Sequence, residues 1–513
     1  VEVVPVRVRT RLFDTLAQDF RLPIVAEAEA EARVAWSRSL AFPGLRAGEQ
    51  LGRHTALPVR AALLARDGSV LAEGPASAAG TRSSPLGAAA SALVGEVGPI
   101  PASSQQALEA QGVPANAIVG VSGLERAEDE RLRGSPGGQL LAEPAGSDPT
   151  RPAAGDGGGA RVLARASAHA GDAVRTTISP AVQSAAVSAL GGQYGGVVAL
   201  APASGEILGV AGIGLDALQP PGSTFKMITV SGVLEAGIAS PRSTFPYQTE
   251  ATLDGVALHN ANGESCGGSL VAAFAASCNS VFAPLGVKLG AARLVATAQR
   301  FGFNHPTGIA GAPESTIPPA AQIQGELAVG STAIGQDQVQ ASALEMALVA
   351  ATIADGGRRP VPSLAPGPGE GGGHRVRAIA AQTARTVRGL MIDVVRFGTG
   401  TAAAIPGVVV AGKTGTAELG SPSSCGASNS ERKSAEGEER SAAERSSEEG
   451  SCSAEQSNPQ NTDAWFAAFA PALHPRIAVA VLMVRDGAGG ATAAPVARQV
   501  LEAGLRATAP VSG

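Results

Sequence analysis

The alternation of apolar and polar residues predicts strands in several parts of the chain. From Val4 to Val8 every second residue is valine, which is the pattern of a half-buried strand. Pro5 lies within this run, and because proline has no backbone N–H it confines the strand to the edge of a sheet. Further strand-like runs are found at residues 33–36, 59–64, 70–71, 196–200, 206–211, 408–411, 463–471 and 477–484. An Asp67-Gly68 turn signal between two of these runs predicts a hairpin.

Helical spacing and low-complexity composition define the remaining segments. Apolar residues at helical spacing predict helices over residues 179–190, 227–234 and 495–505, and residues 83–130 are helical and mixed. Residues 421–461 are rich in Ser, Glu, Arg and Gly and contain almost no large apolar residue, so they predict a disordered insertion. Strand-like runs on both sides of this insertion indicate a hairpin in which the insertion forms an enlarged loop.

The composition is that of a globular protein with more than one domain. Of 513 residues, 44% are apolar and 16% charged, and the length suggests about three units. The net charge is -5 and no block of Lys and Arg is present, so we expect no nucleic-acid partner. The longest apolar stretches are far shorter than the roughly 20 residues that cross a bilayer. The chain begins with Val1 and no leader, so we expect that a signal or anchor segment preceded it.

A serine and a lysine three residues apart form the first chemical motif. Ser223 and Lys226 lie immediately before the predicted helix at residues 227–234, and on a helix such a pair shares one face. A serine hydroxyl is a weak nucleophile until a neighbouring base takes its proton, and a lysine with a lowered pKa can do so. A Ser-x-x-Lys pair alone is weak evidence, because an ordinary first turn of a buried helix has the same sequence.

Two further short motifs follow in the same chain. Ser277 and Asn279, in a stretch that we predict to be helical, supply a hydroxyl that could relay a proton and an amide that could hold a substrate carbonyl. Lys413, Thr414, Gly415 and Thr416 follow the predicted strand at residues 408–411. There the cation and the hydroxyls could bind a carboxylate, and glycine lets a substrate backbone approach a strand edge.

In this order, the three motifs resemble the signature of the penicillin-binding proteins and serine β-lactamases. The flanks at residues 220–226, 398–402 and 412–418 also resemble those of the transpeptidases. The chain is most similar to the class B, monofunctional members over about residues 175–510. The resemblance implies an α+β fold, in which an antiparallel sheet flanked by helices forms the transpeptidase domain and a non-catalytic α+β region precedes it.

The resemblance also implies a domain order. We expect residues 1–57 to be the remnant of an N-terminal α+β domain, because residues 36–45 and 53–58 resemble the end of that domain in methicillin-resistance-type members. Residues 58–174 would form the non-catalytic dimerisation or linker domain, on the resemblance of residues 121–138. Residues 175–513 would form the transpeptidase domain, with the insertion at 421–461. The chain would then act on the extracytoplasmic side of the bacterial membrane, anchored by a segment that precedes it.

The activity implied is peptidoglycan D,D-transpeptidation through an ester on Ser223, with Lys226 as proton acceptor and Ser277 as proton relay. Lys413, Thr414 and Thr416 would bind the terminal carboxylate of a stem peptide, Asn279 its amide, and the N–H groups of Ser223 and Thr416 an oxyanion. Expected partners are stem peptides, β-lactam antibiotics and cell-wall glycosyltransferase, division or elongation proteins. We expect no cofactor and no metal.

Three other functions fit the same motifs. A β-lactamase or β-lactam sensor would use the same acyl-enzyme, but Glu314 lacks the Leu-Asn context of a deacylating glutamate because Ile317 and Pro318 stand in its place. A D,D-carboxypeptidase differs only in using water as the acceptor. A catalytically silent scaffold of cell-wall synthesis is the third alternative, and intact motifs disfavour it.

Four cysteines allow at most two disulfides. We expect Cys425 and Cys452 to close the insertion as a disulfide, since they are its only cysteines. For Cys266 and Cys278 we favour two buried free thiols over a bridge. No Cys and His spacing resembles a zinc site, and the histidines are expected to be surface or structural residues.

Overall fold

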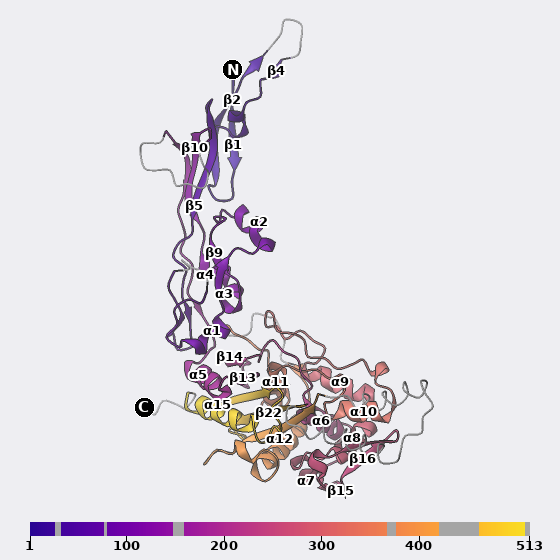
Figure 1. The fold of residues 1–513 in the computed structure, drawn as a ribbon. Coiled ribbons are helices and arrows are strands. Elements are labelled where there is room, and N and C mark those ends of the chain that lie inside the picture. Colours follow the sequence, from indigo (N-terminus) through magenta and orange to yellow (C-terminus); the bar gives the residue numbers. More distant parts are fainter. Residues whose placement is uncertain (26–31, 76–79, 147–158, 367–375, 420–460, 508–513) are drawn as a thin grey trace, which may run out of the picture. The chain divides into compact units, whose positions relative to one another are not determined.

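The computed structural model describes residues 1–25, 32–75, 80–146, 159–366, 376–419 and 461–507. These residues form two compact units, Val1–Leu64 with Gly68–Arg175 and Ala65–Asp67 with Thr176–Gly513. Figure 1 shows both units, and each is described by itself below. The predicted insertion at 421–461, with the predicted Cys425–Cys452 bridge, lies almost wholly outside the described residues.

The first unit begins with the predicted edge strand. Strand β1 (Glu2–Arg9) pairs antiparallel with β2 (Thr15–Leu22) in a two-stranded sheet, and its valines alternate with exposed residues. The strand-like run at residues 33–36 contains the short β4 (Arg33–Val34), which pairs with β3 (Ile24–Val25). Both strand predictions are therefore confirmed.

Two three-stranded sheets make up most of the first unit. In one, β10 (Gly137–Pro144) lies between β5 (Glu49–Ala56) and β11 (Arg161–Ala166). In the other, β6 pairs antiparallel with β7, which confirms the hairpin predicted around Asp67-Gly68, and parallel with β12. The bounds of the smaller elements are β6 (Leu63–Leu64), β7 (Val70–Ala72), β8 (Val97–Pro99), β9 (Ile118–Gly120), β12 (Val174–Arg175) and η1 (Arg38–Ala41).

Short helices and a buried ionic cluster complete this unit. The helices are α1 (Ala88–Val94), α2 (Ala102–Ala110), α3 (Gly123–Ala127) and α4 (Asp129–Arg133). The buried carboxylate of Glu125 accepts hydrogen bonds of 2.7 Å from Arg60 and from Arg82. Asp129 accepts from Arg60 at 2.7 Å and from Arg133 at 3.0 Å. Charges buried in this way are tolerated because each is paired and hydrogen-bonded.

The second unit is built on a five-stranded antiparallel sheet with the order β14-β13-β23-β22-β21. Two of the inner strands, β22 (Thr462–Ala470) and β23 (Ile477–Met483), are buried at every position, in line with their largely apolar sequences. The other strands are β13 (Gly195–Leu200), β14 (Ile207–Gly212) and β21 (Ala411–Glu418). Strands β21 and β22 flank the insertion and pair with each other, which confirms the predicted hairpin.

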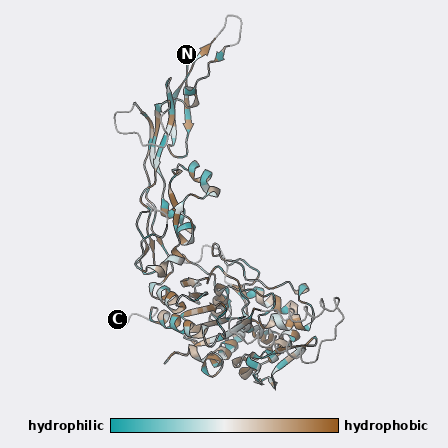
Figure 2. Ribbon diagram, in the orientation of Figure 1, coloured by the Kyte–Doolittle hydropathy of each residue, from teal (hydrophilic) through white to brown (hydrophobic). Residues whose placement is uncertain are grey.

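Helices cover both faces of this sheet. Helices α5 (Pro180–Leu190) and α15 (Ala493–Ala507) pack on one face in a core that includes Val197, Phe466 and Val500. Helix α11 (Ala343–Ala354) is buried at every position, packs on β13, β22 and β23, and contributes no residue to that core, so it covers the other face. Figure 2 shows the strongly apolar residues concentrated in these strands and helices.

Local signals fix where these helices begin and end. Pro180 occupies the first turn of α5, where no N–H is needed, and Gly191 ends the helix in the left-handed conformation. The Ser342 hydroxyl caps α11 by accepting from the Glu345 N–H. The remaining helical elements are η2 (Gly222–Phe225), α6 (Lys226–Glu235), η3 (Ala261–Gly263), α7 (Leu270–Ala275), α8 (Asn279–Leu289), α9 (Ala291–Phe301), η4 (Ala320–Gln322), α10 (Gly325–Ala333), α12 (Ala381–Arg396) and η5 (Thr401–Ala403).

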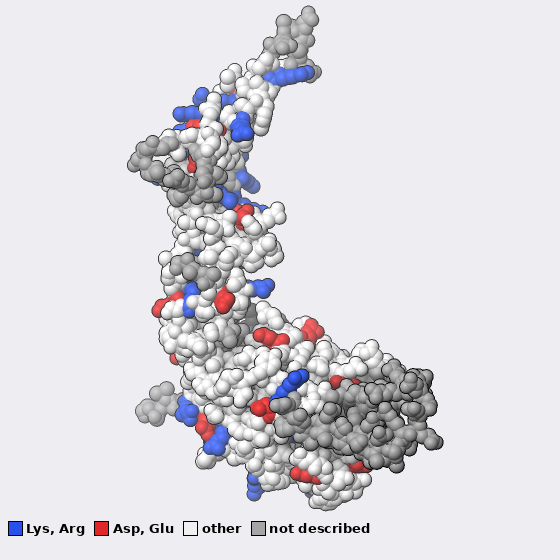
Figure 3. All heavy atoms as spheres, in the orientation of Figure 1, with Lys and Arg blue, Asp and Glu red and all other residues white. Residues whose placement is uncertain are grey.

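Small two-stranded sheets and the charge distribution complete the description. The additional strands are β15 (Thr244–Gln248), β16 (Glu250–Leu253), β17 (Val256–His259), β18 (Cys266–Ser269), β19 (Arg358–Arg359) and β20 (Val376–Arg377). On the face shown in Figure 3, charged side chains of both signs are scattered over the surface. Among the described residues, no single helix is long and apolar enough to cross a membrane, and only the pair α8 and α9, bent by 101°, reaches that length together.

Candidate active site

The Ser223 and Lys226 motif lies where a tight turn runs into a helix. Ser223 is in the 3-10 turn η2, and Lys226 is the first residue of α6. The predicted helix is confirmed, and the serine precedes it by one turn. The turn starts at Gly222, whose φ of 51° favours glycine and whose N–H donates to the Gly335 carbonyl. This geometry places Lys226 Nζ 2.9 Å from Ser223 Oγ.

The amine of Lys226 is buried among oxygen atoms. Its nitrogen lies 2.7 Å from the Ser277 carbonyl oxygen and 2.6 Å from Asn279 Oδ1, both of which can only accept. A neutral amine has two N–H groups and one lone pair. It can therefore donate to those two oxygens and accept the proton of the Ser223 hydroxyl, which is the arrangement that a general base needs.

Ser277 lies in a turn between two helices. The stretch was predicted to be helical, and this is wrong at Ser277 itself: α7 ends at Ala275, α8 begins at Asn279, and the serine between them has a φ of 61°. A non-glycine residue with positive φ is uncommon and occurs where surrounding contacts hold it. Here the Ser277 hydroxyl contacts both Lys226 and Lys413.

Lys413 is inside a strand and not after one. The strand was predicted at residues 408–411, but β21 runs from Ala411 to Glu418, so Lys413 to Thr416 all belong to it. Strand β21 is an edge of the sheet, with β22 as its only strand neighbour among the described residues. The Lys413 ammonium is fully buried and donates to Ser277 Oγ at 2.8 Å and to the Thr414 carbonyl at 2.9 Å.

Burial sets the protonation of both lysines. Burial lowers the pKa of Lys226 well below its ordinary value, and the charge of Lys413 lowers it further. Burial also lowers the pKa of Lys413 to about 7. Both amines contact phenylalanine rings, Lys226 at 5.8 Å from the centroid of Phe282 and Lys413 at 5.6 Å from that of Phe274. The aromatic contacts keep water away from the lysines while offering a partner to the charged form.

The strand and the nucleophile turn are in direct contact. A side chain at Gly415 would meet the Pro221 carbonyl at 2.8 Å, and one at Gly222 would meet the Thr416 carbonyl at 2.6 Å. Glycine at these two positions therefore lets the backbones of η2 and β21 approach each other. This approach joins the turn that carries Ser223 to the strand that carries Thr416.

The structure thus brings together every residue that the sequence singled out. Ser223, Lys226, Ser277, Asn279 and Lys413 form one continuous hydrogen-bonded cluster. Thr414, Gly415 and Thr416 follow on the same strand. Within the ranges that the structure describes, no group of three or more His, Cys, Asp or Glu side chains is arranged to hold a metal ion.

The sequence analysis did not identify several residues that support this cluster. Cys266 and Cys278 form a disulfide, so the prediction of two free thiols is wrong, although both residues are buried as expected. Cys278 lies between Ser277 and Asn279, and the bridge therefore ties the turn to β18. In the sequence, only the position of Cys278 inside the motif hinted at this disulfide. A separation of 12 residues between two cysteines does not by itself indicate that they pair.

A second anchor of the same turn is Asn260, which is buried. Its side-chain oxygen accepts from the Ser280 N–H at 2.8 Å, and its amide nitrogen donates to the carbonyls of Gln248 and Glu264. The neighbouring His259 carbonyl accepts from the Asn279 amide at 2.7 Å. The residue before Asn260 thus fixes the orientation of the Asn279 amide, leaving its oxygen for Lys226.

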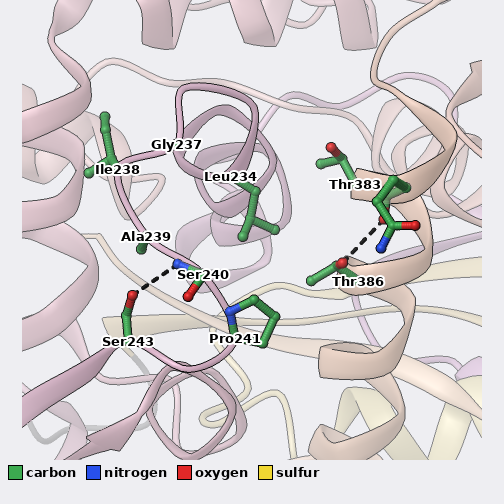
Figure 4. Close-up of a pocket in the computed structure, with 10 residues that line it drawn as sticks. Leu234, Gly237, Ile238, Ala239, Ser240, Pro241, Ser243, Thr383 and Thr386 are labelled. Atoms are coloured by element: carbon green, nitrogen blue, oxygen red, sulfur yellow. Dashed lines mark hydrogen bonds between the residues drawn. The ribbon is translucent and has the colours of Figure 1, made fainter.

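A separate hollow lies away from these residues. It is found between the C-terminal end of α6 and α12, and Figure 4 shows Leu234, Pro241, Thr383 and Thr386 around it. None of the motif residues lines this hollow. We therefore place the chemistry at the hydrogen-bonded cluster and not at this pocket.

Comparisons with known proteins agree with the geometry. Residues 195–437 match the model of the penicillin binding protein transpeptidase domain, and residues 75–149 match that of the penicillin-binding protein dimerisation domain. The peptidoglycan D,D-transpeptidase PbpA of Mycolicibacterium smegmatis is 33% identical over 458 residues, which cover 75% of this chain and 80% of that protein. The chain belongs to the class B penicillin-binding proteins. The family predicted from the three motifs is therefore confirmed.

Solved structures give the same fold for this penicillin-binding protein. The D,D-transpeptidase domain of a peptidoglycan glycosyltransferase from Eggerthella lenta is 27% identical, with a TM-score of 0.62 over 88% of this chain and 99% of that one. The penicillin G acyl-enzyme complex of penicillin-binding protein A from Mycobacterium tuberculosis is 26% identical, with a TM-score of 0.61 over 87% and 99%. The predicted α+β transpeptidase fold is confirmed.

Proposed function

We propose that this penicillin-binding protein is a peptidoglycan D,D-transpeptidase whose nucleophile is Ser223. The observation that supports the assignment most strongly is the contact of 2.9 Å between Ser223 Oγ and the buried amine of Lys226. Relatives that align with three quarters of this chain are named peptidoglycan D,D-transpeptidase PbpA, and a related structure is an acyl-enzyme of penicillin G. The same serine would be acylated by β-lactams.

In the acylation step, Lys226 takes the hydroxyl proton while Ser223 Oγ bonds to the carbonyl carbon of the penultimate D-alanine. The N–H groups of Ser223 and Thr416 would stabilise the oxyanion, and losing one such donor costs about 3 to 4 kcal/mol of barrier. The bond to the terminal D-alanine then breaks, and its amine receives a proton through Ser277, which contacts both lysines. The product is an ester on Ser223.

In the second step, an amine of another stem peptide attacks this ester. The amine bonds to the ester carbon and loses a proton to Lys226, the bond from that carbon to Ser223 Oγ breaks, the oxygen takes up this proton from Lys226, and a cross-link forms. Lys413, Thr414 and Thr416 would hold the terminal carboxylate of the donor, because a buried cation and strand hydroxyls match an anionic group. Asn279 would hold an amide of the peptide. The chemistry needs no cofactor.

The alternative functions are less well supported. Glu314 is exposed, so it does not offer the enclosed position from which a β-lactamase glutamate activates water. A catalytically silent scaffold does not require two buried lysine amines in contact with one serine. A carboxypeptidase would share every contact described here, and only the acceptor distinguishes it.

The surroundings of the enzyme follow from its substrate. Stem peptides of peptidoglycan lie outside the cytoplasmic membrane, so we place the chain there, anchored by a segment that precedes Val1.

We assign residues 1–57 to the remnant of an N-terminal domain, 58–174 to the dimerisation or linker region and 175–513 to the transpeptidase domain. Glycosyltransferases and other division or elongation proteins are the expected protein partners.

The test is product analysis with a pentapeptide donor and an amine acceptor. The wild type should release D-alanine and form the cross-linked product, Ser223→Ala should do neither, and Ser188→Ala, an exposed serine on α5, should behave as wild type. Release of D-alanine without any cross-link would identify a carboxypeptidase. Activity that survives in Ser223→Ala would refute the assignment of the nucleophile.

A further inference from the structure

A threonine outside the three motifs shares a hydrogen bond with the second residue of the strand motif. Thr399 Oγ1 lies 2.6 Å from Thr414 Oγ1. Thr399 is exposed and Thr414 is buried, so this hydroxyl pair lies at the boundary between solvent and the strand. The buried Thr414 hydroxyl gains a partner from this contact, whereas the exposed Thr399 could hydrogen-bond to water instead.

The backbone of Thr399 is fixed on two sides. Its N–H donates to the Ala275 carbonyl at 3.1 Å, at the end of α7 and two residues before Ser277. Its carbonyl is so close to Gly490 that a side chain there would meet it at 2.2 Å. Thr399 therefore bridges the Ser277 turn and strand β21 at a defined position.

Within a pair of hydroxyls, one donates to the other, and the acceptor then has its own proton free for a third group. Chains of this kind polarise each other and strengthen the outer hydrogen bond, most of all when the third group is an anion. A parallel arrangement is found at Thr416, whose Oγ1 accepts from the Gly489 N–H at 3.5 Å and so keeps its proton free as well.

We infer that Thr399 is a positioning residue for the substrate carboxylate, acting through Thr414. Its hydroxyl pairs with that of Thr414, and the pair presents one O–H to the carboxylate beside the Lys413 charge. The inference rests on the proposed function. It assigns to Thr399, which lies outside the three motifs, a part in the specificity for substrates with a free carboxylate.

The test compares two ligands that differ only in that carboxylate. Second-order acylation rates are measured with penicillin G and with its methyl ester, on the wild type and on Thr399→Val, which keeps the shape and the backbone bond but removes the hydroxyl. Because a hydrogen bond to a charged group is strong, the variant should lose about tenfold with penicillin G and change little with the ester. Thr399→Ser should restore the rate with penicillin G.

The matched control is Thr401→Val, an exposed threonine two residues later at the start of η5. It should behave as wild type with both ligands. Equal losses of Thr399→Val with acid and ester would show a structural role only, and no loss with either would show no role, so both results overturn the inference. If penicillin G fails to acylate Ser223 even in the wild type, the proposed function itself is refuted, and this inference is refuted with it.

Discussion

Replacing Lys413 with methionine is expected to change the shape of the pH profile of acylation as well as its height. Lys226 acts as a base only when neutral, so the rate rises as the pH rises through its pKa. Lys413 holds a carboxylate only when charged, so the rate falls as the pH rises past its pKa of about 7. The wild-type profile should therefore be a bell whose two apparent pKa values belong to the coupled pair.

The size of the change follows from the distance between the two amines. Their nitrogens contact the same Ser277 Oγ at 2.8 Å and 3.3 Å, so they are at most about 6 Å apart. Two unit charges at about 6 Å interact by about 3 kcal/mol at an effective dielectric constant of about 20, which corresponds to about two pKa units. Because about 6 Å is the longest possible separation, this interaction energy is a lower limit, and without the Lys413 charge the pKa of Lys226 should rise.

The assay is the second-order rate of penicillin acylation between pH 5 and 10. In Lys413→Met, the acid limb should move to higher pH because the pKa of Lys226 rises, and the alkaline limb should disappear, leaving a single rising curve. Lys288→Met, an exposed lysine on α8, serves as the control and should keep the wild-type bell. A uniform loss in Lys413→Met, with both limbs in place, would refute the coupling between the two lysines.

Two further predictions concern the turn that holds Ser277. Replacing both Cys266 and Cys278 with serine should lower the free energy of unfolding by about 3 kcal/mol, measured by urea denaturation, because the bridge closes a loop of 12 residues; unchanged stability would contradict this. Asn260→Ala leaves the Ser280 N–H without its partner and should lower the unfolding free energy by roughly 1 to 3 kcal/mol. It should also slow acylation, and a normal rate in a destabilised variant would show that Asn260 does not position the site.

The sequence predicted those features that depend on the residue type and its spacing along the chain, both in the site and in the buried strands. Ser223 and Lys226 were placed correctly because a tight turn and a helix start both bring residues i and i+3 to one face. The inner strands β22 and β23 were predicted well because strands buried on both faces read as unbroken apolar runs.

The sequence was misleading where tertiary contacts override local pattern. The apolar residues 408–411 suggested a strand that ends before Lys413. Pairing with β22 instead makes Ala411–Glu418 the strand and buries the lysine. Ser277 looked helical because residues on both sides are helical. The Cys266–Cys278 bridge and the Thr399 contact with Thr414 join separate elements, and no local pattern predicts such pairs.

Intact-protein mass spectrometry after incubation with a penicillin tests the central claim most directly. The wild type should gain the mass of one antibiotic molecule, peptide mapping should locate it on Ser223, and Ser223→Ala should gain nothing. An adduct of the same size on Ser223→Ala, or on a peptide without residue 223, would contradict the account.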